Sequence, residues 1–155
     1  MNNCCYISVS DIIQICICCV SVFMPLLVIY INYYMDKKKT IKSELLQCVS
    51  MNYNSTKYIW NVISIGNNTN RSVCFYEWLA IHINILGILQ RNINDKIALL
   101  ELHNAFDKLV HTSTQNGAGF PDMNIEKDLY YIQEKEIDII NKYMKTEFSY
   151  SCYKQ

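Results

Sequence analysis

The stretch DIIQICICCVSVFMPLLVIYINYYMDKKKTIK, residues 11–42, decides how the rest of the chain is organised. From Ile12 to Tyr34 it runs for 23 residues without an ionised side chain. As a helix, this run would be about 35 Å long, which exceeds the roughly 30 Å of a bilayer hydrocarbon core. It therefore predicts a transmembrane helix over residues 12–35 with ends at Ile12 and Tyr34, after a short tail over residues 1–11.

Two features favour an uncleaved anchor over other apolar helices. Pro25 lies near the centre of the run, where it would break a soluble helix, but transmembrane helices tolerate proline because neighbouring groups satisfy the freed carbonyl. We expect a kink at Pro25 and not a helix end. The leading residues MNNCCYISVSD contain no Lys or Arg, and no A-x-A pattern follows the run, so we expect no signal-peptide cleavage.

Lysines mark the end of the apolar run and set its orientation. All 14 Lys and Arg residues lie after Tyr34. Basic residues flank membrane spans on the cytoplasmic side, so this asymmetry predicts a cell-membrane protein with its N-terminus outside and its C-terminal body in the cytoplasm. The residues that set this topology are Lys37, Lys38, Lys39 and Lys42.

Three Asn-x-Ser/Thr triplets, at Asn54, Asn67 and Asn70, keep the opposite orientation open. They would accept glycans only if the body were lumenal. An Asn-rich chain also produces such triplets by chance, and the lysine pattern favours the cytoplasmic side.

The overall charge excludes one class of partner. The chain carries 14 Lys and Arg against 14 Asp and Glu, so its formal net charge is zero. A nucleic-acid-binding surface needs an excess of positive charge, and we expect no nucleic-acid partner. The expected partners are the lipid bilayer and another protein or a second copy of the chain.

The cysteine spacing resembles that of a zinc or redox site, but the surrounding sequence does not support such a site. Of eight cysteines, five lie in the first 19 residues, and Cys16 and Cys19 match C-x-x-C. Zinc and redox sites need accessible thiolates with a second pair or a histidine nearby, and this pair lies inside an apolar span. We interpret these residues as small packing side chains and expect no metal and no cofactor.

The body has helical periodicity throughout. Residues 36–65 predict a basic junction and a helical stalk, with the polar NYNST at residues 52–56 as a candidate interruption. Residues 66–155 predict a cytoplasmic helical domain. Its core helices are expected over residues 73–89, from an N-cap at Asn94 or Asp95 to about His111, and over residues 122–147. The fold class is therefore all-α: one N-terminal transmembrane helix followed by a small bundle of three or four helices.

Candidate catalytic groups are few. His82, His103 and His111 are the only histidines, and none belongs to a catalytic sequence motif. Glu77 lies beside Trp78 in the most apolar helix of the body, and it is a candidate buried carboxylate that would need a partner, unless it lies on a solvated edge. We expect no enzymatic activity. The alternative is a membrane-tethered enzyme with a site around Glu77 and His82 or His103.

One segment carries a family resemblance. FYEWLAIHINILGILQRNINDKIALLELHNAFDKLV, residues 75–110, resembles small membrane-anchored all-helical proteins of bacteria and their mobile elements, some of them linked to abortive phage infection. The resemblance implies a protein-interaction domain in phage defence or a mobile-element accessory role, and it carries over no catalytic residue. The residues that carry it are Phe75, Tyr76 and Glu77 at the start of a core helix, and Gly87, Ile88, Ile93 and Leu99 after it.

Overall fold

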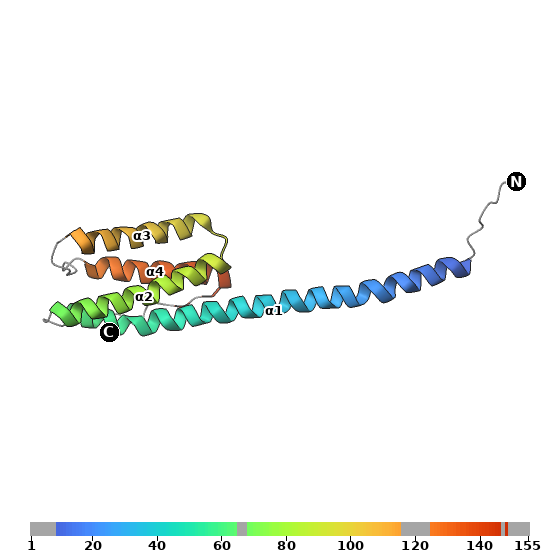
Figure 1. The fold of residues 1–155 in the computed structure, drawn as a ribbon, viewed down its shortest axis with the longest axis horizontal. Helices are drawn as coiled ribbons and strands as arrows, with labels where there is room; N and C mark the ends of the chain where they lie inside the picture. Colours follow the sequence, from blue (N-terminus) through green and yellow to red (C-terminus); the bar gives the residue numbers. More distant parts are fainter. Residues whose placement is uncertain (1–8, 65–67, 116–124, 147, 149–155) are drawn as a thin grey trace. The chain divides into compact units, whose positions relative to one another are not determined.

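The computed structural model describes residues 9–64, 68–115, 125–146 and 148 of the chain. These residues form four helices, which confirms the predicted all-α class for the described part (Figure 1). The helices are α1 (Val9–Ser64), α2 (Asn68–Asn92), α3 (Lys96–Gln115) and α4 (Ile125–Met144). The chain divides into two compact units, Met1–Thr40 and Ile41–Gln155.

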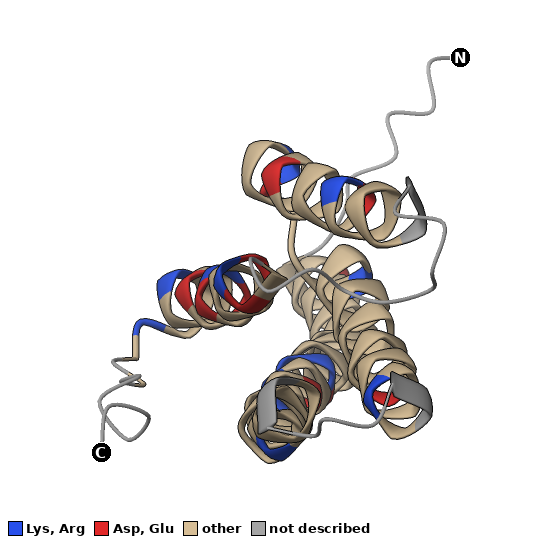
Figure 2. Cartoon of the chain, turned by 90° about the vertical axis from the view of Figure 1, so that its left-hand side faces the viewer, with Lys and Arg blue, Asp and Glu red and all other residues tan. Residues whose placement is uncertain are grey.

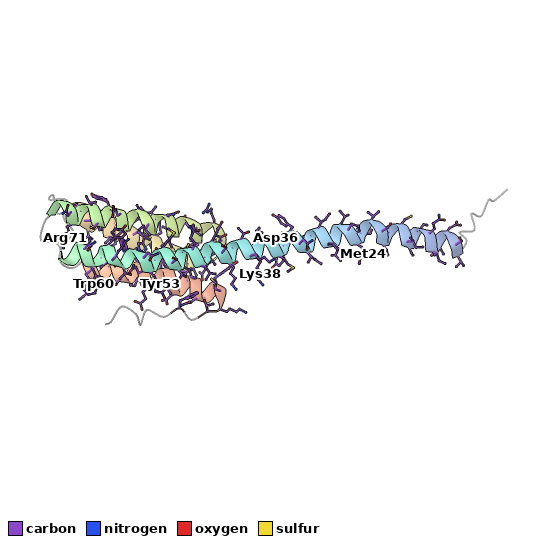
Figure 3. The ribbon with its side chains drawn as sticks, turned by 90° about the horizontal axis from the view of Figure 1, so that it is seen from below. Met24, Asp36, Lys38, Tyr53, Trp60 and Arg71 are labelled. Carbon is purple, nitrogen blue, oxygen red and sulfur yellow. The ribbon has the colours of Figure 1, made fainter. Side chains whose placement is uncertain are left out.

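In the first unit, the apolar run forms the first part of α1. Every residue from Val9 to Thr40 is exposed, and the side chains of this part, Met24 among them, project from the helix without covering protein (Figure 3). The helix continues through Pro25, so the proline does not end it, as predicted. An apolar helix that no protein covers needs another apolar phase around it, so this unit is compatible with membrane anchoring.

Among the residues that the structure describes, two helices are long and apolar enough to cross a membrane, one within α1 and the other Asn70–Asn92 of α2. These two candidate spans differ in how much of each is buried. None of the most apolar part of α1 is buried, whereas 39% of the corresponding part of α2 lies inside the structure. Apolar residues of α2 therefore also serve the core of the second unit.

The second unit is built around one apolar core to which all four helices contribute. The core residues recur at steps of three and four along each helix, which places them on a single stripe per helix. The largest fully buried side chains are Leu45 and Ile59 of α1, Trp78, Ile85 and Leu89 of α2, Leu102 and Leu109 of α3, and Leu129, Ile132, Ile137 and Ile140 of α4.

The second compact unit begins inside the segment predicted as a stalk. Residues 36–65 are predicted to form a basic junction and a helical stalk, and the second unit begins at Ile41. From there onward α1 supplies buried core residues, including Leu45 and Ile59, so it is a structural helix of the domain. The polar residues 52–56 do not interrupt α1 either, because their buried side chains find hydrogen bonds on other helices.

Polar contacts fix the ends of α3 and α4. The backbone N–H of Ala98 donates to Asp95 Oδ1 at 3.2 Å, which confirms an N-cap at Asp95. Lys142 Nζ donates to Asp95 Oδ2 at 2.7 Å, and this contact and the cap hold the pKa of Asp95 below its usual range. After Met144 the chain turns through Lys145, whose φ is 54°, so α4 ends before the predicted residue 147, which itself lies outside the described residues.

Charged residues of the second unit are spread over its helices and do not gather by sign (Figure 2). Two ion pairs join α3 to α4: Lys108 to Asp128 at 3.2 Å and Lys135 to Glu101 at 3.3 Å. Exposed pairs of this kind contribute about 0–1 kcal/mol each, so the apolar core and not the surface charge holds the helices together.

The neighbouring residues Leu45 and Leu46 test whether α1 belongs to the domain core. Leu45 is fully buried, whereas Leu46 is 42% exposed. Leu45→Ala should lower the free energy of unfolding of the second unit by about 2–5 kcal/mol, because it leaves a cavity. Leu46→Ala should change it by about 0.5 kcal/mol or less. Urea-dependent labelling of the buried Cys48 thiol, read by mass spectrometry, measures both, and equal effects would contradict the assigned boundary.

Candidate functional site

Six polar side chains lie buried where α1, α2 and α4 meet. They are Asn52, Ser55 and Thr56 of α1, His82 of α2, and Gln133 and Glu136 of α4. Burying a polar group costs free energy unless it is hydrogen-bonded, so their arrangement is the most demanding feature of the core. We call these six residues the polar cluster.

Helical spacing explains why each helix presents its polar residues together. Asn52, Ser55 and Thr56 are separated by three and four residues, so they share one face of α1. Gln133 and Glu136 are three apart and share one face of α4. On both helices, this face also carries the buried apolar residues of the core.

The centre of the polar cluster is a chain of three side chains from three helices. Ser55 Oγ lies 2.7 Å from His82 Nε2. The other ring nitrogen, His82 Nδ1, lies 2.8 Å from Glu136 Oε2. All three side chains are fully buried. The imidazole of His82 also stacks on the Trp78 ring, with the ring centroids 4.0 Å apart.

Two amides tie α1 directly to α4. Asn52 Nδ2 donates to Glu136 Oε2 at 2.8 Å and to the backbone carbonyl of Gln133 at 3.1 Å. In return, Gln133 Nε2 donates to the backbone carbonyl of Asn52 at 3.1 Å and to Ser55 Oγ at 2.8 Å. These bonds run in both directions, so they fix the lengthwise position of one helix against the other.

The hydrogen bonds assign the protons. Ser55 Oγ lies 2.6 Å from the backbone carbonyl of Asn52, which only accepts, so the single hydroxyl proton of Ser55 points there. His82 Nε2 must then carry a proton and donate it to Ser55 Oγ. Between His82 Nδ1 and Glu136 Oε2 one further proton is needed, because two acceptors cannot form a bond. The His82–Glu136 pair is therefore neutral as a whole.

The order serine, histidine, carboxylate is also that of the hydrolase triad, but the proton arrangement differs. In a triad the histidine accepts the serine proton, whereas here His82 donates to Ser55 and the serine proton is held by a carbonyl. All three side chains are also closed off from solvent. As arranged, the polar cluster is a structural lock between helices and not a nucleophilic site.

Burial affects one thiol close to the polar cluster. Cys48 lies on the core face of α1 and is fully buried. Burial raises the pKa of the Cys48 thiol from 9.0 to about 12, and the carboxyl groups of Glu136 and Glu44 add to the effect. Cys48 is consequently a neutral packing side chain at physiological pH.

The structure does not assemble the site that the sequence suggested. Glu77 lies on the exposed face of α2 and is not the buried carboxylate, because its position faces away from the core stripe. His82 is fully buried, whereas His103 is exposed, 3.6 Å from Asp107 on its own helix. Glu77, His82 and His103 therefore do not share a cleft. His111 is also exposed.

The true buried carboxylate, Glu136, was missed because it lies in the charged run QEKEID. Helical spacing is the sequence feature that indicates its burial. Position 136 is eleven residues after Ile125 and seven after Leu129, which is core-facing spacing on a helix. A carboxylate on an otherwise apolar stripe marks a buried polar contact.

The remaining predicted positions lie on exposed surface. The anchor ends Ile12 and Tyr34 are exposed on α1. The lysines that set the topology, Lys37, Lys38, Lys39 and Lys42, are exposed as well. Of the glycosylation triplets, Asn54 and Asn70 are exposed, whereas Asn67 lies outside the described residues. The Asn54 triplet is a poor acceptor in the folded domain because its hydroxyl residue, Thr56, is buried.

Comparison of the chain with protein-family models, curated proteins and solved structures finds no match. Within the described ranges, no group of three or more His, Cys, Asp or Glu residues is placed to hold a metal ion.

Substitutions at Glu136 should show that the polar cluster is structural. Glu136→Ala should destabilise the second unit by about 3–5 kcal/mol, because it leaves His82 and Asn52 buried without a partner. Glu136→Gln should cost less, since an amide keeps the volume of the side chain and one of the two hydrogen bonds that Glu136 Oε2 makes, to His82 Nδ1 or from Asn52 Nδ2. Glu134→Ala, on the exposed face of the same helix, is the matched control, with an expected change of about 0.5 kcal/mol or less.

Urea unfolding followed by labelling of Cys48 measures all three variants. Equal stability of Glu136→Ala and Glu134→Ala would contradict the assigned role. So would covalent labelling of Ser55 in the folded protein by a fluorophosphonate, which reacts with activated serines.

Cys48 should make stability fall at alkaline pH. Its folded-state pKa lies above the ordinary value of 9.0, so the thiol stabilises the fold fully below pH 9, and this contribution is lost as the pH rises toward about 12. The loss should be roughly 1 kcal/mol for each pH unit between 9 and about 12. Urea unfolding between pH 8 and 11, compared with Cys48→Ala, isolates this contribution from the tyrosines. Parallel curves for the two proteins would contradict the raised pKa.

Proposed function

We propose that this protein is a single-pass membrane protein whose helical domain works on the cytoplasmic side by binding another protein or a second copy of itself. The observation that carries this proposal is that one helix, α1, has two kinds of surface. From Ile12 to Tyr34 it is apolar and exposed, and from Ile41 onward it supplies core residues to the domain. α1 therefore contributes residues to both units.

The orientation rests on charge. The exposed lysines at positions 37, 38, 39 and 42 follow the apolar run directly, and Asp11 is the only charged residue before Tyr34. Basic residues next to a span are retained on the cytoplasmic side, which supports a cytoplasmic domain.

A binding role, and not catalysis, is supported by where the polar and apolar groups lie. The histidine of the polar cluster is closed off and its protons are committed to structural bonds. The surface of the second unit, in contrast, carries large apolar side chains, including Trp60, Tyr76, Ile83 and Ile97. Tyr76 and Ile83 are seven residues apart on α2 and so lie on one face, and an exposed apolar face of this kind is typical of interaction surfaces.

The setting of this activity follows from the resemblance of residues 75–110 to membrane-anchored helical proteins of bacteria and mobile elements. Phage defence, or an accessory role for a mobile element, is the proposed context. In either one, the anchor would hold the binding domain at the inner face of the cell membrane.

Fractionation and protease protection in bacterial cells test the proposal. The full chain with a C-terminal tag should stay in the membrane fraction after carbonate extraction. Its body should be protected from protease in spheroplasts and digested in inverted vesicles. Replacement of Lys37, Lys38 and Lys39 by Gln should reduce the protected fraction, because it removes most of the charge asymmetry. A carbonate-soluble chain would contradict the anchor, and a body digested in spheroplasts would contradict the orientation.

A further inference from the structure

The outward face of α2 carries an apolar row that the domain does not use. Val73, Tyr76, Ala80, Ile83 and Gly87 follow one another at steps of three, four, three and four residues. The first four are exposed and Gly87 is partly exposed. A Cβ at Gly87 would meet no atom within 4 Å, so this end of the row is open. We call these five residues the α2 seam.

The spacing of the α2 seam fits another helix. Apolar residues at alternating steps of three and four form the contact line of paired helices, where each side chain enters a gap on the facing helix. The α2 seam contains no ionisable carboxylate or amine. The opposite face of α2 already contacts the core through Trp78, Ile85 and Leu89, so the helix is apolar on two sides.

We propose that the α2 seam binds the α2 seam of a second copy of this chain, with the two helices antiparallel. This inference rests on the proposed function as an interaction domain and names its partner. Large and small residues complement each other in that arrangement. Because 76 plus 87 equals 80 plus 83, a single register places Tyr76 opposite Gly87 of the second copy and Ile83 opposite its Ala80.

A parallel pair would pack less well. It would set Tyr76 against Tyr76 and Gly87 against Gly87, so that one layer is crowded and another is empty. Cores are stable when large side chains face small ones and no void is left. The residue sizes along the α2 seam therefore favour the antiparallel pair.

Charge along one edge of the α2 seam supports the same orientation. Glu77, Asn84 and Arg91 are exposed and follow one another at steps of seven residues, so they line a single edge. In an antiparallel pair, the Glu77 end of one copy lies over the Arg91 end of the other. In a parallel pair, the two charged edges lie on opposite sides of the contact and Glu77 does not meet Arg91. Opposite charges across a helix pair help to set its orientation.

The oligomeric state of the full chain tests the proposal. In detergent micelles, light scattering corrected for detergent should give twice the chain mass of 18.2 kDa for the wild type. Ile83→Lys should give the monomer mass. Ile83 is 53% exposed, so this variant should keep the wild-type circular dichroism and Cys48 protection.

Ile97→Lys is the matched control for Ile83→Lys. It places the same charge on an apolar residue that is 75% exposed but lies on α3, away from the α2 seam, and this variant should stay dimeric. A monomeric wild type, or a dimer that survives Ile83→Lys, would overturn the proposal. So would a wild-type monomer whose α2 seam is shielded from labelling only by phospholipid vesicles, since lipid would then be the occupant.

Cross-linking between two differently tagged copies tests the orientation. A Tyr76→Cys copy mixed with a Gly87→Cys copy should form a bismaleimide-linked heterodimer, above the background that the native cysteines give in the wild type. The mixed pair should be linked several times more than either variant with itself. Preferential linking of each variant with itself would overturn the antiparallel register.

The outcomes separate this inference from the proposed function. A chain that is anchored with its body in the cytoplasm but is monomeric would refute the α2 seam alone. A chain that dimerises through the α2 seam but does not enter membranes would refute the proposed function alone.

Discussion

His82 Nδ1 and Glu136 Oε2 lie 2.8 Å apart inside an apolar core, and the packing of α1, α2 and α4 depends on that contact. Separation of the pair would leave an ionisable group buried without a partner, which costs several kcal/mol. Asn52 donates to the same carboxyl oxygen, and Ser55 contacts the other side of the imidazole ring. Three helices must therefore meet in one register for any of these groups to be satisfied.

Such a polar cluster contributes specificity more than stability. Apolar packing alone tolerates sliding of one helix along another, whereas a set of directional hydrogen bonds is complete in one position only. The polar cluster still has a cost, because Glu136 Oε1 and Gln133 Oε1 are buried without a hydrogen-bond partner among the described residues. A domain that binds through its outer surface benefits from such rigidity, because the residues on that surface then keep fixed relative positions.

The two apolar faces of α2 connect the core to the surface. The inner face contributes Trp78, which stacks on His82. The α2 seam on the outer face starts from the same turns of helix, so the register set by the polar cluster also sets the position of the seam. α3 and α4 differ from α2 in this respect, since exposed ion pairs such as Lys135 with Glu101 join their outer surfaces. The structural lock and the proposed interaction surface thus belong to one helix.

The sequence by itself determined the helical class, the apolar run from Ile12 to Tyr34 and a helix cap at Asn94 or Asp95, because each depends on residues close together in the chain. Periodicity also indicates which face of a helix turns inward. It does not indicate what lies opposite that face. Asn52 and Ser55 continue the stripe of Leu45 and Cys48, yet they are tolerable in a core only when partners arrive from other helices.

Tertiary structure alone decided that those partners exist. Ser55 meets His82 across 27 positions of the chain, and Asn52 meets Glu136 across 84. No local pattern encodes such pairings, since hydrogen-bond complementarity is a property of two surfaces and each helix supplies only one. For the same reason the sequence placed a helix interruption at residues 52–56 and a candidate buried carboxylate at Glu77, whereas the folded chain keeps α1 continuous and buries Glu136.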